Sequence, residues 1–200
     1  MCEHCTRRGF LGTGAASGLL LAGTTWADTQ ATKSPPPRPP RKSRICVVFT
    51  GNPQPEDRNW GADIKQIEAM KARLAEAEQK LANVELLVGQ SRSPQETDEL
   101  LKKAGPEAPV LAINVQNFAM TRVVGPILDS ARPLAVFALP ASGHDWMYAP
   151  RWLREGHRVA LLASSDYDEL ERALRLLRVI PMMRRTKILL FPPARGTEPA

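Results

Sequence analysis

The strongest constraint on the fold is an alternation, from Arg44 onward, of short continuous apolar runs with longer segments of helical periodicity. The apolar runs predict strands at 44–52, 84–90, 108–115, 133–140, 157–165 and 186–193. The periodic segments predict helices at 62–84, 93–105, 120–131 and 165–180. Strands joined by helices imply right-handed crossovers. The sequence therefore predicts an α/β, three-layer flavodoxin-like or Rossmann-like domain with a mostly parallel sheet of five or six strands.

Three predicted helices carry specific signals. The first has one apolar stripe at three- and four-residue spacing, made by Ile64, Ile67, Met70, Leu74, Ala77 and Leu81. The second has Ser93 as its N-cap, Pro94 at its first position and Gly105 past its end. Ser165 and the acids after it suit the start of the last helix, whose apolar face holds Tyr167, Leu170, Leu174 and Leu177. The acids within 76–80 and 169–172 are predicted to be solvated charges on exposed helix faces.

The first 27 residues have the layout of a secretory signal. Arg7 and Arg8 precede a short apolar run that ends at Leu21, and small residues lead to Ala27. The paired arginines followed by Gly-Phe-Leu resemble the twin-arginine type, which implies transient contact with the export machinery and a periplasmic or secreted protein. A retained membrane anchor is the alternative, although the run is short for a bilayer.

Further boundaries follow from composition. Residues 28–43 are rich in Pro and Arg and predict an extended linker, 44–193 form the α/β domain, and 194–200 are a tail. The formal net charge of +6 owes much to the linker and to residues 184–187. No aromatic-basic interleaving or nucleic-acid motif accompanies this charge, so we expect a solvated surface and no nucleic-acid partner.

The motifs of metal, redox and nucleotide sites are incomplete. Cys2 and Cys5 form a single C-x-x-C around His4, without the second ligand pair of a structural zinc site, and Cys46 lies inside an apolar strand. The first strand leads into Thr50-Gly51-Asn52-Pro53 instead of G-x-G-x-x-G, and no P-loop sequence is present. We therefore expect neither a bound cofactor nor a metal site.

Polar side chains follow the predicted strands at their carboxyl ends, where open parallel sheets bind ligands. These candidate ligand-binding residues are Thr50, Asn52, Asn114, Gln116, Asn117, Ser142, His144, Asp145 and Trp146. Their amides and hydroxyls suit a small sugar or polyol, and an indole offers a stacking face. Ser164 and Ser165 follow the fifth strand at the same edge.

The stretch PASGHDWMY, residues 140–148, contains the residue types of a catalytic triad. Neighbours such as Ser142, His144 and Asp145 do not by themselves reach triad geometry, and His157 is expected at the opposite edge of the sheet. A hydrolase that uses Ser142 and His144 is thus the weakest reading. We expect instead that Asp145 orders the loop and that Trp146 and Tyr148 pack on the core.

Residues 142–191 also resemble part of a known family. The polar loop, the strand that ends in serines, the D-x-x-E-L-E-x-A-L-R-x-L-R helix and the R-x-T-K-I-L strand are similar, in this order, to the amino-terminal domain of L-fucose and L-arabinose isomerase-like proteins. The family's metal ligands and acid-base carboxylates come from later domains, so no catalytic residue carries over to this chain.

The signal layout and the resemblance together imply an exported domain that is not catalytic alone and that binds a sugar or polyol. The alternative is one lobe of a periplasmic binding-protein-like fold. Both readings leave room for an oligomer or a missing second domain. Because sugar isomerisation needs a base and usually a divalent ion held by several oxygens, we expect no isomerisation by this chain alone.

The signal layout gives the first prediction. The exported protein is expected to begin near Asp28, because cleavage follows the small residues that end at Ala27. Edman sequencing of protein recovered from the periplasm measures this directly. An intact Met1 on that protein would contradict the prediction.

Overall fold

The computed structural model describes residues 41–56, 61–116, 118–140 and 145–188. The chain divides into two compact units, Met1–Arg38 and Pro39–Ala200. All the described residues belong to the second unit. The predicted signal, most of the linker and the tail lie outside the described residues.

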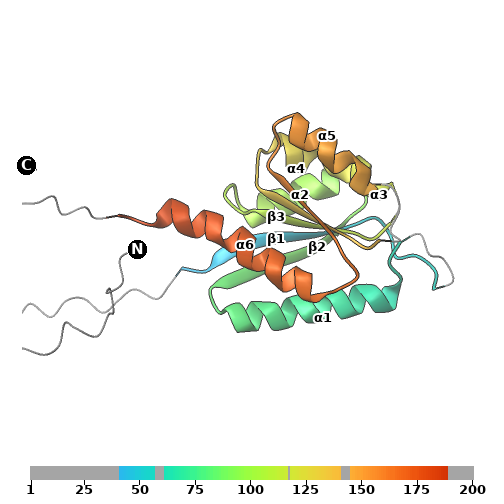
Figure 1. Cartoon of the computed structure of the whole chain (residues 1–200), viewed down its shortest axis with the longest axis horizontal. Helices are drawn as coiled ribbons and strands as arrows, with labels where there is room; N and C mark the ends of the chain where they lie inside the picture. Colours follow the sequence, from blue (N-terminus) through green and yellow to red (C-terminus); the bar gives the residue numbers. More distant parts are fainter. Residues whose placement is uncertain (1–40, 57–60, 117, 141–144, 189–200) are drawn as a thin grey trace, which may run out of the picture. The chain divides into compact units, whose positions relative to one another are not determined.

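The described strands form one parallel sheet (Figure 1). They are β1 (Ser43–Thr50), β2 (Val84–Ser91), β3 (Val110–Asn114), β4 (Leu134–Ala138) and β5 (Val159–Ala163). All four pairings are parallel and the order is β2-β1-β3-β4-β5. This is the flavodoxin-like order, with its topological switch point between β1 and β3. The predicted fold class is confirmed.

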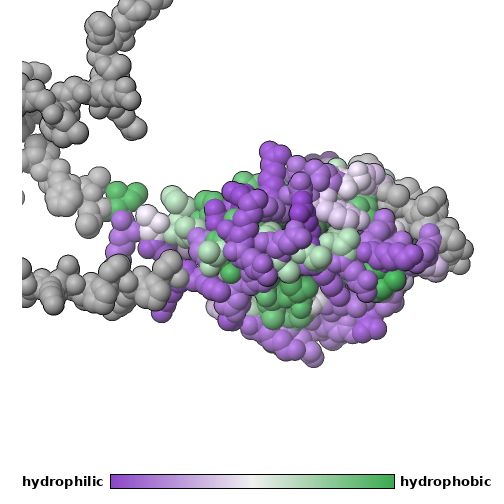
Figure 2. All heavy atoms as spheres, turned by 90° about the horizontal axis from the view of Figure 1, so that it is seen from below, coloured by the Kyte–Doolittle hydropathy of each residue, from purple (hydrophilic) through white to green (hydrophobic). Residues whose placement is uncertain are grey.

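Helices cover both faces of the sheet (Figure 1). They are α1 (Ile64–Leu81), α2 (Pro94–Ala104), α3 (Ala119–Val123), α4 (Gly125–Asp129), the 3-10 helix η1 (Asp145–Tyr148), α5 (Ala149–Arg154) and α6 (Asp168–Arg185). The apolar cluster on one face contains side chains of α1 and α6, and the cluster on the other contains side chains of α2, α3, α4 and α5. Seen from the side of α1, the surface is mostly hydrophilic with small apolar patches (Figure 2).

The core is organised around β1, which is buried on both faces. Val47 and Phe49 point into the cluster under α1 and α6, whereas Cys46 and Val48 point into the cluster under α2. Successive side chains of a strand point to opposite faces, so one continuous apolar run supplies both cores. Burial raises the pKa of the Cys46 thiol to about 11, which leaves it as a neutral core residue.

The helix signals are largely confirmed. The Ser93 hydroxyl accepts a hydrogen bond from the Glu96 amide at 3.2 Å, and Gly105 ends α2 with a φ of 89°. Helix α1 begins with a capping box, in which Asp63 accepts from the Gln66 backbone and Gln66 accepts from the Asp63 backbone. Its apolar stripe is buried except for Ile64, which is 48% exposed.

Two helical predictions are corrected. The segment 120–131 is not one helix, because Gly125 and Pro126 start the separate helix α4 and proline has no N–H to continue α3. Ser165 does not cap α6. Tyr167 precedes its first residue without a side-chain cap, and the Asp166 carboxylate accepts the Asp168 amide at 2.9 Å.

The last part of the chain differs in extent from the prediction. Helix α6 continues through Pro181 to Arg185 instead of ending at 180. Residues 186–188 form no strand, and the rest of the predicted sixth strand lies outside the described residues. No helix in the described part of the chain is long and apolar enough to span a membrane.

The packing of α6 generates the second prediction. Leu174 and Leu176 both lie on α6. The Leu174 side chain is buried in the core, whereas that of Leu176 is 59% exposed. We expect Leu174→Ala to lower the free energy of unfolding by about 2–5 kcal/mol through cavity formation. The matched Leu176→Ala change should stay within about 0.5 kcal/mol. Urea denaturation followed by circular dichroism measures both values. Equal losses would show that α6 does not pack through this face.

Candidate functional site

The carboxyl ends of β1 and β3 meet at the switch point, where Thr50 is in register with Asn114. Both residues are buried. The Thr50 hydroxyl lies 3.3 Å from the backbone oxygen of Ile113 and 3.3 Å from Oδ1 of Asn114. The structure therefore brings these two predicted residues together, but it places the Thr50 hydroxyl inside the sheet edge, where it stabilises the edge itself.

Gln116 links the two strands beyond their ends. Its side-chain Oε1 accepts a hydrogen bond from the backbone N–H of Asn52 at 2.9 Å, and its backbone N–H donates to the Thr50 carbonyl at 3.2 Å. Gln54 Nε2 donates to the Asn52 carbonyl at 2.9 Å. The backbone of Asn52 is thus held on both sides, while Asn52 itself is exposed to solvent.

The segment between β1 and α1 pairs with the residues that follow β3. Ala62 donates to the Val115 carbonyl at 2.7 Å, and Gly61 forms an antiparallel bridge with Gln116. Gly61 has a φ of 152°, and a Cβ there would lie 2.3 Å from the Val115 oxygen. Only glycine permits this approach. The loop is therefore fastened across the switch point and fixes the position of Asn52.

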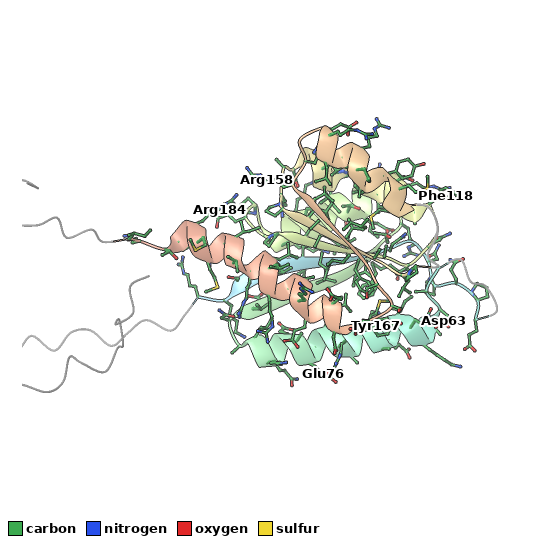
Figure 3. The ribbon with its side chains drawn as sticks, viewed as in Figure 1. Asp63, Glu76, Phe118, Arg158, Tyr167 and Arg184 are labelled. Atoms are coloured by element: carbon green, nitrogen blue, oxygen red, sulfur yellow. The ribbon has the colours of Figure 1, made fainter. Side chains whose placement is uncertain are left out.

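The β5 side of the same edge carries a second set of polar groups. Ser164 Oγ accepts from the Asp166 amide at 3.0 Å, and the Ser164 amide donates to the Ala138 carbonyl at 3.2 Å. The Tyr167 ring lies edge-on to Phe137 at 6.4 Å, and burial raises the pKa of Tyr167. Figure 3 shows Tyr167 and Asp63 at this end of the sheet.

The stretch PASGHDWMY is described in part. Asn117, Ser142 and His144 lie outside the described residues, and for Asp145 and Trp146 the structure describes only the backbone of η1. Tyr148 is 37% exposed instead of packed in the core, and its ring stacks on Trp152 at 6.5 Å. The buried aromatic side chain here is that of Trp152 and not, as predicted, that of Tyr148. The end of this stretch thus acts as the elbow into α5.

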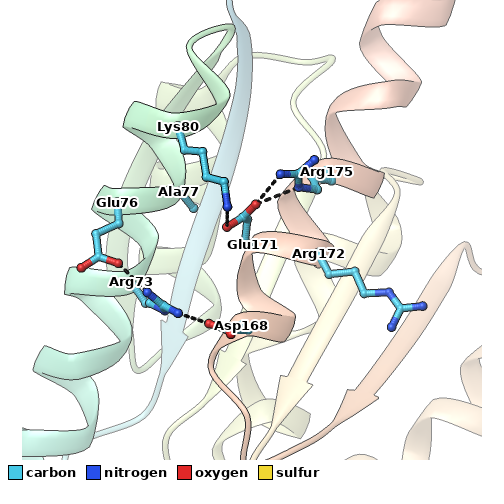
Figure 4. Close-up of a pocket in the computed structure, with 8 residues that line it drawn as sticks. All are labelled: Arg73, Glu76, Ala77, Lys80, Asp168, Glu171, Arg172 and Arg175. Carbon is cyan, nitrogen blue, oxygen red and sulfur yellow. Dashed lines mark hydrogen bonds and ion pairs between the residues drawn. The ribbon is translucent and has the colours of Figure 1, made fainter.

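Charged side chains line a hollow of about 350 Å³ between α1 and α6 (Figure 4). Arg73 contacts both Glu76 and Asp168, and Glu171 accepts from Lys80 at 3.0 Å and from Arg175. Hydrogen bonds from Lys80 and Arg175 lower the pKa of Glu171. These groups satisfy one another, so the hollow joins two helices and offers no free charge cluster to a ligand.

The sequence predicts Glu76 and Glu171 of this hollow as solvated charges and does not predict their ion pairs. Lys80 and Glu171 are far apart in sequence, and only the placement of α1 beside α6 brings them together. The signal available in the sequence was complementary charge on the borders of two apolar stripes.

Three metal-ligating side chains do not converge anywhere in the ranges that the structure describes. No family model matches the chain, and no curated protein or solved structure matches it either. Among the described residues, the edge at the carboxyl ends of β1 and β3 is therefore the feature that bears on function.

The pairing of the loop with β3 gives the third prediction. We expect Gly61→Ala to lower the free energy of unfolding by about 1–3 kcal/mol, because the new Cβ overlaps the Val115 oxygen. Gly125→Ala is the matched control, since nothing lies within 4 Å of a Cβ built there and its φ is ordinary. It should be neutral or stabilising by up to about 1 kcal/mol. Thermal unfolding distinguishes the two, and a harmless Gly61→Ala would contradict the close approach.

Proposed function

We propose that this protein is an exported, sugar-isomerase-like amino-terminal domain that is not catalytic alone and that binds a sugar or polyol at the β1–β3 edge. One observation carries the proposal. At the switch point, hydrogen bonds to both backbone groups of Asn52 fix its position while it stays exposed. Switch points are where open parallel sheets bind their ligands.

The chemistry of this edge suits a polyhydroxyl ligand. A sugar hydroxyl both donates and accepts hydrogen bonds, and an amide side chain such as that of Asn52 offers both a donor and an acceptor. Because the loop is already held by Gln116 and Gly61, little ordering is needed when a ligand arrives. Asn117 and His144 follow β3 and β4 in sequence and lie outside the described residues, and the sequence predicts them at the same edge.

The fourth prediction tests this site. Titration of the isotope-labelled protein with L-fucose, L-arabinose or the corresponding alditols should shift the amide signals of Asn52, Asn114, Asn117 and His144 together. Asn52→Ala should weaken binding about tenfold, because it removes hydrogen bonds of a fixed group. Gln79→Ala removes an exposed amide on α1, away from the edge, and should leave binding unchanged.

Two outcomes would contradict the proposal. Shifts confined to the helices, or no shifts with any sugar or alditol, would indicate a structural role for the edge. Formation of ketose from fucose or arabinose with Mn²⁺ or Mg²⁺ would contradict the non-catalytic part of the proposal.

A further inference from the structure

Strand β5 forms one border of the sheet, and its outer edge has no strand partner among the described residues. A groove of about 440 Å³ lies beside it, between the sheet and α6. Its floor is formed by Ala135, Ala160 and Leu162, and its wall on α6 by Leu176, Leu177 and Ile180. Its lining is mostly apolar.

The groove lies beside α6, at the end of the helical layer that covers this face of the sheet. On this face the described part of the chain provides only α1 and α6, which pack against each other, whereas α2, α3, α4 and α5 lie on the opposite face (Figure 1). Helices pack about 8–10 Å apart and strands about 4.8 Å apart, so one helix covers roughly two strands. Two helices therefore leave a strip over β5, beside α6, where one more helix can pack: β4 is buried throughout, whereas Ala160 is exposed and Leu162 is half-buried.

Exposed apolar side chains border this strip. Leu153 is 53% exposed, Leu176 is 59% exposed and Met183 is 61% exposed. Leu176, Ile180 and Met183 recur at helical spacing along α6. A continuous apolar strip on a folded domain is typical of a surface that another element covers.

Two basic side chains without an ion-pair partner in the described part of the chain lie at one end of the groove, where β5 begins and α6 ends. His157 and Arg158 line it, and no Asp or Glu does among the residues described there. Arg184 follows Ile180 by one helical turn. Arg158 at the start of β5 and Arg184 near the end of α6 (Figure 3) have no ion-pair partner within the described ranges. An occupant with acidic borders would complement them.

We propose that this groove binds one amphipathic helix of a partner polypeptide, apolar on one face and acidic along its borders. Its apolar side chains would lie against Leu162, Leu176 and Ile180, and its carboxylates would face Arg158 and Arg184. This is the helix-in-groove mode of recognition, in which residues at i, i+3, i+4 and i+7 supply the anchors.

The sequence pattern of residues 186–193 predicts a strand and not the helix that would fill this groove. They follow α6 directly, and α6 lies on the same face as α1, the helix that leads from β1 outward to β2. A strand reached from β5 through that face and placed beyond β5 would make a left-handed crossover, which parallel sheets almost never contain.

A second copy of the chain also fits poorly. Pairing two β5 edges would place two uncovered strips side by side and leave both apolar grooves open. A second copy also brings the same basic residues, without acids to face them.

The fifth prediction uses two designed 18-residue helical peptides as probes. Both carry leucines at i, i+3, i+4 and i+7, and their remaining positions are Glu in one and Lys in the other. Fluorescence anisotropy with the full chain should show the Glu peptide binding at least about tenfold more tightly, because its charge complements the groove. Leu176→Asp should weaken binding of the Glu peptide about tenfold or more. Ile64→Asp, the same change at an exposed position on α1, should leave it unchanged.

Charge reversal adds a second readout. Arg158→Glu and Arg184→Glu together should remove or reverse the preference for the Glu peptide. Since all of these positions are exposed, the variants should keep the circular dichroism spectrum of the parent chain.

Three results would overturn the proposal. Equal affinity for the Glu and Lys peptides would remove the charge argument. If Leu176→Asp leaves the affinity for the Glu peptide unchanged, the peptide binds at another surface and not in this groove. A dimer seen by light scattering and dissolved by Leu176→Asp would identify a second copy as the occupant.

Discussion

The burial of β1 on both faces is the constraint on which the rest of the structure depends. A strand with apolar side chains on both sides is stable only between two layers of helices, and β1 supplies Phe49 to one core and Val48 to the other. The chain leaves β1 for β2 through α1 on one face and returns past β1 to β3 through α2 on the other face, because right-handed crossovers in opposite directions need opposite faces. The two layers and the switch point are thus consequences of one buried strand.

The same burial explains why the carboxyl end of β1 is rigid. Polar groups that end a buried strand must find partners within the protein, since an unsatisfied buried group costs about 1–3 kcal/mol. The Thr50 hydroxyl therefore contacts Asn114, and Gln116 accepts the Asn52 amide. Gly61 lets the loop approach closely enough to complete this network. A side chain carried on such a fixed backbone, as Asn52 is, needs little ordering to meet a ligand.

Local patterns predicted the elements well, and the contacts between distant elements much less. The apolar run of β1, the stripe of α1 and the Ser93 cap are properties of a few neighbouring residues, so the sequence shows them directly. The candidate site was predicted as an edge, because every strand end was visible. The structural role of Gln116 could not be predicted, because it depends on the pairing of Gly61, in the loop before α1, with Gln116 after β3. The pairing of Lys80 with Glu171 likewise depends on which helices share a face.

The arrangement of helices also explains the surface beside α6. Alternating strands and helices fix how many helices a chain has, but the strand order decides how they are divided between the faces. In the order β2-β1-β3-β4-β5, each step outward toward β5 places its helix on the face of α2, and only α1 and the final α6 remain for the other face. Two helices on a five-stranded sheet bury β4 but leave β5 partly exposed on that side. The apolar strip that Leu162 and Leu176 border thus follows from topology, and Arg158 and Arg184 at one of its ends favour an acidic occupant.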